Sequence, residues 1–556
     1  MFAPTLRGYR KAWLPADLVA GATVGAMLVP QAMAYAELAG LPPSIGFQAA
    51  LAPLIVYALV GGSRHLGVGP EPGTAVLAAA GVGLVAGGDP NTYVALMAAL
   101  ALLVGAIALI AAVLRLGVLA DLLSKPVLVG YITGVGLTLI SSQLAKATGV
   151  PVTGDDFFVR FASFFAALGA MKIPILLVFV GSLALILGLK KLAPRVPAAL
   201  VAVLLATLVT ALSALDIPKV GQVAALTLTP SFPPVALGDV LALVPTALGI
   251  ALVGYTDNVL TARSVASRHA YKIDPQRELY ALGATNTAAG LFGGFPVSSS
   301  ASRTAVPSSL GSHSQLVGLV AALFLVLALT LAPAVLAAMP SAALAAVIVS
   351  AALAIIDVDG YRRLWRVSRS ELLLAVVAAL AVMVFDVLVG VLIAFVLSVV
   401  LLVRRLSRPH DTTLALDPSR GGWVDARHYG LPPTFIGLLV YRFDAPLFFG
   451  NIERFRARLS ESLRDNPGEE RWVVLDLEGV GEVDATALDG LRELIGELTH
   501  GGQVVAAARA NPRVLEALTR GGIVEAGLRP FPTIHSAVEA FRKEHPDQPV
   551  ETPPGV

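Results

Sequence analysis

Apolar residues fill long, nearly uninterrupted runs before residue 404 and do not recur with the period of an amphipathic helix or a half-buried strand. Residues 97–114 carry no charged side chain, and residues 372–403 carry only Asp386. A run of roughly 20 apolar residues crosses a bilayer as a helix. The pattern therefore predicts an α-helical membrane protein with about 14 spans, separated by Gly, Pro and charged residues.

Composition agrees with this interpretation and excludes several classes of site. The 556 residues are 56% hydrophobic and 14% charged, whereas soluble domains carry about 25% charged residues. Cysteine is absent, which excludes disulfides, thiolate metal sites and cysteine nucleophiles. No histidine cluster or phosphate-binding loop is evident either. We therefore expect neither an enzyme nor a nucleic-acid-binding protein, and no metal or cofactor.

Charge divides the chain into two parts. Residues 1–408 hold 25 Lys and Arg against 16 Asp and Glu, a net charge of +9, whereas residues 409–556 hold 15 against 22, a net charge of −7. Pro and Gly then interrupt the sequence up to about residue 430, and ordinary amphipathic sequence follows. We expect a transmembrane domain over 1–408, a linker over 409–430, a soluble α/β domain over 431–545 and a disordered tail over 546–556.

The distribution of basic residues predicts the orientation of the spans. Cytoplasmic loops of membrane proteins are enriched in Lys and Arg. With the N-terminus inside, 21 of the 25 basic residues before residue 409 fall on the cytoplasmic side, and only Lys146, Arg160, Lys172 and Lys219 fall outside. We therefore expect an even number of spans in the cell (inner) membrane, with both termini in the cytoplasm.

Two short apolar segments are opened by Gly, Pro and Ser. The first is residues 67–76 (GVGPEPGTAV) and the second is residues 293–306 (GGFPVSSSASRTAV); both end in Thr-Ala-Val. Paired interrupted segments at corresponding positions indicate an inverted repeat with broken helices that meet near the membrane midplane. The free N–H groups at a helix N-terminus attract anions. Re-entrant loops or glycine-rich packing seams remain the alternative.

At these residues the chain resembles the sulfate permease (SulP) family of anion transporters. The resemblance is carried by VPQAMAYA at 29–36, LAGLPP at 38–43, GSRHL at 62–66, LSKPV at 123–127 and SRTAV at 302–306. The C-terminal part resembles the family's STAS domain through APLFFGN at 445–451, VLDL at 474–477 and VDATA at 483–487.

Several expectations about architecture follow from this resemblance. It implies fourteen helices in a 7+7 inverted repeat, in which a core domain (spans 1–4 and 8–11) moves against a gate domain (spans 5–7 and 12–14). The substrate anion would lie between the N-termini of half-helices 3 and 10. The resemblance also implies a homodimer, which the residues themselves do not indicate.

Candidate ion-coupling residues are the carboxyls within the apolar region, because charged groups there are costly and tend to be functional. Asp257 interrupts the eighth span, where the family usually carries an acid, and would bind a proton or sodium or offset Arg303; a structural ion pair is the alternative. Glu71 lies in the first broken segment, where relatives often have an apolar residue. A carboxylate beside an anion must be neutralised, which favours proton coupling, unless Glu71 only caps the half-helix.

Candidate substrate-binding residues complete the site. Gln31 and Tyr35 lie on one face of the first span, where they would line the cavity as in the family or hold helices together. Thr261 follows Asp257 by one turn and could offer a hydroxyl. Arg303 would supply positive charge. The remaining candidates belong to the two broken segments and are Gly73, Thr74, Ala301 and Ser302.

In the soluble domain, Val473–Leu477 is expected to be a buried strand and Ala485–Leu498 a helix. Relatives in sporulation signalling phosphorylate a Ser just after the Asp of this motif, whereas Ala485 and Thr486 stand here. Thr486 is more simply interpreted as the cap of the helix.

Three functions remain open from the sequence. The leading hypothesis is an alternating-access transporter of small anions coupled to protons or sodium, with sulfate, bicarbonate and dicarboxylates such as fumarate as possible substrates. An uncoupled anion channel and a membrane sensor that signals through its STAS domain are the alternatives. The sequence does not distinguish the substrate, the coupling ion, its stoichiometry or the partner of the STAS domain.

Overall fold

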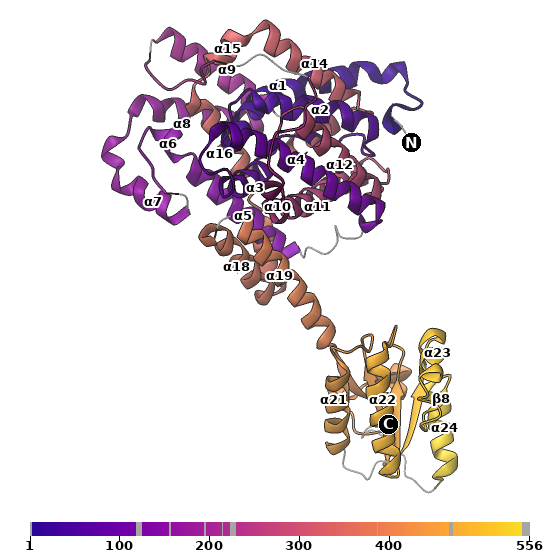
Figure 1. Cartoon of the computed structure of the whole chain (residues 1–556). Coiled ribbons are helices and arrows are strands. Elements are labelled where there is room, and N and C mark those ends of the chain that lie inside the picture. The colour runs from indigo at the N-terminus through magenta and orange to yellow at the C-terminus, as the bar shows by residue number, and fades with distance from the viewer. Residues whose placement is uncertain are drawn as a thin grey trace. The chain divides into compact units, whose positions relative to one another are not determined.

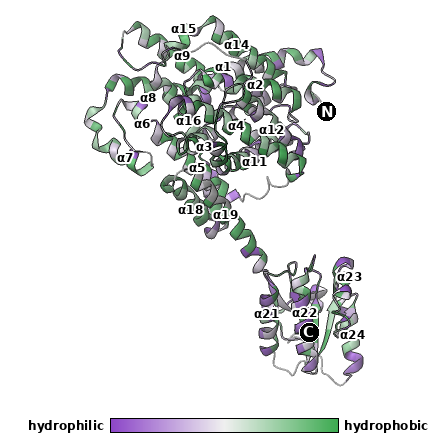
Figure 2. Ribbon diagram, in the orientation of Figure 1, coloured by the Kyte–Doolittle hydropathy of each residue, from purple (hydrophilic) through white to green (hydrophobic). Residues whose placement is uncertain are grey.

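The chain folds into two compact units, residues 1–398 and 399–556, which are described separately. The computed structural model describes residues 3–117, 125–154, 157–193, 196–213, 215–222, 229–385, 387–465 and 471–546. Helices dominate the first unit and a sheet covered by helices forms the second (Figure 1). Hydrophobic residues, drawn in green, predominate in the helices of the first unit (Figure 2).

The first unit contains helices of very different lengths. Five helical stretches, at Lys11–Leu38, Pro90–Val113, Lys125–Ser142, Ile173–Leu192 and Ser341–Val367, are long and apolar enough to cross a membrane among the residues described. The elements in order are α1 (Leu14–Leu38), α2 (Ile45–Val60), β1 (Val68–Gly69), α3 (Pro72–Gly83), α4 (Pro90–Val113), α5 (Lys125–Ser142), α6 (Leu144–Thr148), α7 (Phe157–Ala166), α8 (Ile173–Leu192), α9 (Ala198–Leu212), α10 (Leu237–Ala242), α11 (Val244–Arg268), α12 (Pro275–Leu291), β2 (Ser298–Ser299), α13 (Ala301–Ser309), α14 (Leu316–Leu331), α15 (Pro333–Ala337), α16 (Ser341–Ile355), α17 (Val358–Val367), α18 (Arg369–Phe385) and α19 (Val387–Ser407).

Helix packing in this unit repeats with the order of the predicted spans. Helix α1 packs on α14, and the corresponding pair in the other half, α11 and α4, is also in contact. In the same way, the contact between α4 and α12 corresponds to the contact between α14 and α2. Likewise α5 packs on α18 as α16 packs on α8. Each pair of contacts is exchanged when the first seven expected spans are matched to the second seven. The packing therefore has the internal symmetry expected of a repeat, while the count of fourteen spans stays a prediction.

Two groups of helices can be distinguished by these contacts. Helices α1–α4 and α11–α14 pack mainly on one another and are called the core group; α5, α6, α8, α9, α16 and α18 form the gate group. Small residues allow close crossings within each group. A Cβ at Gly130 of α5 would lie 2.0 Å from the carbonyl oxygen of Ala375 in α18, so only glycine permits this helix contact.

The second unit is a six-stranded sheet in the order β4-β3-β5-β6-β7-β8. Strands β5 to β8 run parallel, whereas β3 pairs antiparallel with both β4 and β5. The elements are β3 (Asp411–Asp417), β4 (Gly422–Asp425), α20 (Ala426–Tyr429), β5 (Leu438–Phe443), α21 (Ile452–Arg464), β6 (Trp472–Asp476), α22 (Ala485–His500), β7 (Val504–Ala508), α23 (Pro512–Arg520), β8 (Arg529–Phe531) and α24 (Ile534–Glu544).

Alternating residues of the central strands bury the two faces of this sheet. Val473 and Leu475 of β6 pack with helices α21, α22 and α23, whereas Trp472 and Val474 pack with α24 on the opposite face. Period-two burial on both faces is typical of a parallel sheet covered by helices. The expected strand and helix at 473–477 and 485–498 are confirmed, with β6 beginning and ending one residue earlier, at Trp472 and Asp476, and α22 extending to His500.

Two expectations about this unit are wrong. Residues 409–430 do not form a linker, because β3 and β4 lie within them and extend the sheet at its antiparallel edge. Thr486 is not the helix cap: Asp484 accepts a hydrogen bond from the Ala487 N–H at 2.7 Å and begins α22. The expected disordered tail lies outside the described residues beyond Pro546.

Candidate substrate site

Two short strands bring the starts of helices α3 and α13 together. Val68 pairs with Ser299 and Gly69 with Ser298 in antiparallel register, although they come from different halves of the chain. The Ser300 N–H donates to the Gly67 carbonyl, and the Gly67 N–H donates to Thr304 Oγ1, both at 3.0 Å. The two interrupted segments of the sequence therefore form one hydrogen-bonded junction.

Two buried asparagines hold β2 in place. Asn286 in α12 donates from Nδ2 to the Val297 carbonyl and accepts from the Val297 N–H at Oδ1, both at 2.9 Å. Asn258 in α11 accepts from the Ser299 N–H at 2.7 Å. Irregular backbone at membrane depth needs such partners because no water satisfies its polar groups. These side chains therefore fix the position from which α13 begins.

Glu71 caps the N-terminus of α3 with its own carboxylate. Glu71 Oε2 accepts from the Thr74 N–H at 3.0 Å, and the carboxyl is also bonded by the Gly73 N–H. Pro72 has no N–H, and the Ala75 N–H donates to the Glu71 carbonyl at 3.0 Å. The first-turn N–H groups of α3 are therefore already occupied by Glu71, as in the capping alternative of the sequence analysis.

The N-terminus of α13 differs, because no side chain of the described residues is recorded as its cap. Ser300 precedes the helix and makes no side-chain capping bond to the first turn; its hydroxyl lies 3.1 Å from that of Ser302. The N–H groups of a first turn have no partner within their own helix. The uncapped start of α13 therefore offers N–H groups and the positive end of its dipole to an anion.

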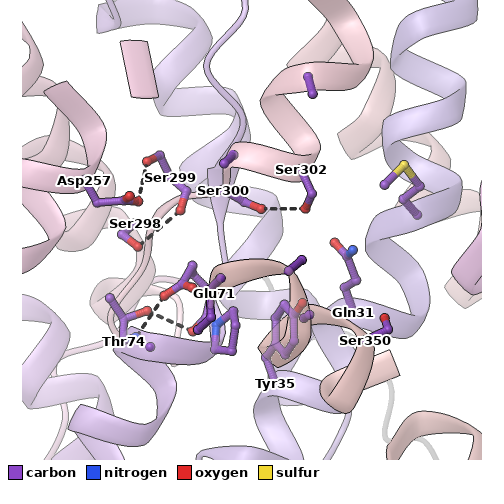
Figure 3. A pocket seen from close by; sticks show the side chains of 18 of the residues that line it. Gln31, Tyr35, Glu71, Thr74, Asp257, Ser298, Ser299, Ser300, Ser302 and Ser350 are labelled. Atoms are coloured by element: carbon purple, nitrogen blue, oxygen red, sulfur yellow. Dashed lines mark hydrogen bonds between the residues drawn. The ribbon is translucent and has the colours of Figure 1, made fainter. Parts of the chain in front are cut away.

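A cavity of about 510 Å³ lies against both helix starts. Its core-group wall includes Gln31, Tyr35, Glu71, Gly73, Thr74, Asp257, Ala301 and Ser302, and its gate-group wall includes Leu128, Tyr131, Val347, Ser350 and Ile355. Figure 3 shows Gln31, Tyr35 and Ser350 on the side opposite Asp257 and Ser299. Eight of the residues selected from the sequence therefore surround one space.

Asp257 is held in this wall by two hydroxyl groups. Its Oδ2 accepts from Ser299 Oγ at 2.8 Å, and its carboxyl is also hydrogen-bonded by the side chain of Thr261. Thr261 itself does not line the cavity. Its predicted contact with substrate is therefore replaced in this structure by a contact with Asp257.

Arg303 lies behind the cavity wall. It is fully buried, and its Nη1 donates to the Pro70 carbonyl at 2.8 Å and, at a longer 3.5 Å, to Gln31 Oε1. Within the described residues it forms no ion pair with Glu71 or Asp257. The expected pairing of Arg303 with a carboxylate is therefore absent here, and Arg303 supports β1 from beneath.

Sequence inspection of the core segments missed the opposite wall. Tyr131, Ser350 and Ile355 come from α5 and α16, where apolar runs gave no local sign of function. The charge bias assigns Lys190 only to the cytoplasmic side, and the structure places it in the cavity lining at the exposed end of α8. Only the packing of the gate group against the core group brings these residues to the site.

Comparison with known proteins identifies the family of this arrangement. The sulfate permease family model matches residues 14–378, and the STAS domain model matches residues 432–537. The chain belongs to the sulfate permease family. It is therefore an anion transporter of the membrane, as the motifs of the two broken segments implied.

Relatives extend across almost the whole chain. A probable sulfate transporter of Mycobacterium tuberculosis is 45% identical over 542 residues, covering 97% of each chain. The chloroplastic sulfate transporter 4.1 of Arabidopsis thaliana is 30% identical over 557 residues, covering 96% of this chain and 81% of the plant protein.

Solved structures share the fold. Murine Slc26a9 in the inward-facing state matches with a TM-score of 0.88 at 23% identity, covering 98% of this chain and 94% of that one. The transmembrane domain of the cyanobacterial bicarbonate transporter BicA matches with a TM-score of 0.61 at 24% identity, covering 70% of this chain and 98% of that one.

Proposed function

We propose that the protein is a secondary active transporter that carries a small anion together with protons by alternating access between its core and gate groups. The observation that carries this proposal is the meeting of an uncapped helix N-terminus with two half-buried carboxyls at one cavity. The helix start attracts an anion, whereas the carboxyls of Glu71 and Asp257 repel it unless they are neutralised.

Charge balance supports coupling to a cation. Arg303 is the only basic side chain beneath the described helix junction, and its guanidinium contacts carbonyl oxygens rather than a carboxylate. At least one carboxyl therefore needs a cation when the anion binds in this buried space. A proton suits Glu71, since a protonated carboxyl still accepts a hydrogen bond from the Thr74 N–H.

Sodium is the second candidate, and the surroundings of Asp257 favour it. The carboxylate and the hydroxyls of Ser299 and Thr261 present oxygen atoms beside the broken helix. Sodium ions of other transporters bind oxygen donors at such interruptions. The site residues proposed for coupling are thus Glu71 for a proton and Asp257 for a proton or sodium.

The remaining features of the proposal follow from charge and relatives. The bias of Lys and Arg supports the cell (inner) membrane with both termini cytoplasmic, and the cavity then opens toward the cytoplasm, where Lys190 and Ile355 lie. Sulfate is the first substrate to test because relatives are named for it, followed by bicarbonate and fumarate. We also propose a homodimer, with regulation through the STAS domain.

Uptake into proteoliposomes tests the proposal. The purified protein is supplied with labelled sulfate, bicarbonate and fumarate, each with an inward pH gradient, an inward sodium gradient or neither. Accumulation above equilibrium with the pH gradient alone supports proton symport, and accumulation with sodium alone assigns sodium. Passive equilibration that no gradient accelerates would favour the channel alternative.

A further inference from the structure

In the described part of the chain, an ion pair joins a helix of the core group to a helix of the gate group. Lys146 Nζ lies 2.7 Å from Glu37 Oε2, with the carboxylate side chain 12% exposed and the lysine side chain 37% exposed. Glu37 is in the last turn of α1, and Lys146 is in α6. Helix α1 packs on α2, α13 and α14 of its own group and also contacts α9 and α16 of the gate group, whereas α6 packs on α8 and α16. The pair therefore adds a charged contact between the end of α1 and α6 to the helix packing that already joins the two groups.

The pair lies at the end of the helices opposite the mouth of the cavity. By the charge bias, α1 begins inside at Leu14 and ends outside near Glu37, and Lys146 is one of the few basic residues assigned outside. The cavity instead reaches Leu128, Lys190 and Ile355, at the inner ends of α5, α8 and α16. The cavity thus lies toward the inner ends of the core and gate helices, whereas the Glu37–Lys146 ion pair connects the two groups at their outer ends.

We propose that Glu37 and Lys146 form an outer latch that stabilises the inward-facing arrangement and must open in each transport cycle. The inference rests on the alternating access of the proposed function. Movement of α1 relative to α6 separates two side chains that meet at 2.7 Å, and a partly desolvated carboxylate left without its partner is unfavourable. Glu37 and Lys146 act as positioning residues, because they hold the two groups and do not contact the cavity.

Sidedness of substrate affinity distinguishes a latch from a merely structural pair. Loss of the latch raises the outward-facing population, and apparent affinity from one side varies with the population that is open to that side. Lys146→Met and Glu37→Gln should each lower the external KM about threefold, the scale of a partly exposed ion pair, with little improvement from the cytoplasmic side. The charge-exchanged double variant Glu37→Lys/Lys146→Glu should return the external KM toward the wild-type value.

Cross-linking tests whether the two residues separate during transport, and the absence of cysteine gives a clean background. Glu37→Cys/Lys146→Cys is treated with a short, reducible bifunctional thiol reagent in proteoliposomes. Cross-linked protein should lose more than nine-tenths of its uptake, retain substrate binding from the cytoplasmic side and recover on reduction. Single-cysteine variants and the double variant Thr148→Cys/Lys172→Cys, which links α6 to the adjacent start of α8 within the gate group, should keep their uptake.

Two results would overturn the latch. Wild-type uptake by the fully cross-linked Glu37/Lys146 protein would show that these residues stay together in the cycle. Equal shifts of KM on both sides, without recovery in the charge-exchanged variant, would assign the pair a structural role. Failure of the proposed function looks different, since the wild-type protein itself would then show no saturable, gradient-driven uptake.

Discussion

Substitution of Glu71 by Gln removes one negative charge from the cavity and leaves an oxygen that can still cap α3. In the structure, Glu71 Oε2 accepts from the Thr74 N–H at 3.0 Å, and the amide oxygen of Gln can accept the same bond. Glu71→Ala removes both the charge and the cap. Comparison of the two variants therefore separates the electrostatic effect on substrate from the structural effect on the half-helix.

The expected magnitudes differ enough to be measured. An anion about 5 Å from an ionised carboxylate is repelled by about 3 kcal/mol at an effective dielectric constant of about 20, which is roughly a hundredfold in affinity. Loss of a helix cap costs about 1 kcal/mol of stability. Wild-type affinity should therefore fall as pH rises and Glu71 loses its proton, whereas Glu71→Gln should bind tightly at all pH values. Glu71→Ala should bind similarly and unfold more readily.

Substrate binding at several pH values and uptake into proteoliposomes provide the assays. Glu71→Gln should lose accumulation driven by an inward pH gradient and retain exchange of labelled for unlabelled substrate, because exchange needs no net proton movement. Asp257→Asn is the matched control at the other carboxyl of the same cavity. It shows whether any loss of coupling belongs to one carboxyl or follows from lower negative charge in general.

Several outcomes would refute the assignment to Glu71. If substrate affinity depends on pH in Glu71→Gln as it does in the wild type, and this dependence is lost in Asp257→Asn, then Asp257 is the coupling group. If both variants still concentrate substrate under a pH gradient, neither carboxyl carries the proton. If wild-type uptake responds to sodium and not to pH, the proton mechanism itself is wrong.

Three further predictions concern topology and the soluble domain. Asn91 is exposed in the first turn of α4. A cysteine substituted there should react with an impermeant maleimide only from outside the cell, and labelling from the cytoplasm would contradict the predicted orientation. Truncation after residue 408 should leave substrate binding within about twofold of the full chain, since α19 ends at Ser407 and no later residue among those described lines the cavity. Isothermal titration of a monodisperse truncate tests this. Hydrogen bonds from Ser419 and the adjacent Arg420 guanidinium hold the pKa of Asp417 below its ordinary value. The stability that this carboxylate contributes above about pH 4 should therefore be lost as pH falls through the lowered pKa. Asp417→Asn should make the thermal unfolding temperature of the soluble domain depend less on pH across this range.

Much of the fold could be predicted because the bilayer restricts what the chain can do. Span-length apolar runs and the excess of Lys and Arg in alternate loops reflect physical requirements that act on sequence directly. The broken helices were also visible, since Gly67 to Pro72 and Gly293 to Pro296 cannot continue a helix smoothly. Helices α3 and α13 begin at Pro72 and Ala301, within these interrupted segments.

The parts that failed depend on contacts between distant segments. Arg303 follows the helix start in sequence, which placed it among the candidate substrate-binding residues, but the β1–β2 pairing leaves it beneath Gly69 with the Pro70 carbonyl as its partner. Residues 409–430 contain enough Pro and Gly to resemble a linker, yet β3 gains pairing on both edges. Local composition carries no information about such partners.

The arrangement of donors at the cavity suits release as well as binding. A transporter must bind its substrate strongly enough to select it and weakly enough to let it go on the other side. Guanidinium groups that contacted the anion directly would form strong charge-assisted pairs, whereas Arg303 is buried behind β1 and contributes field without contact. Backbone N–H groups and hydroxyls at the start of α13 then provide oriented, neutral donors that need little reorganisation. On the mechanism proposed above, the charge of Glu71, rather than the strength of the donors, would determine when the anion stays and when it leaves.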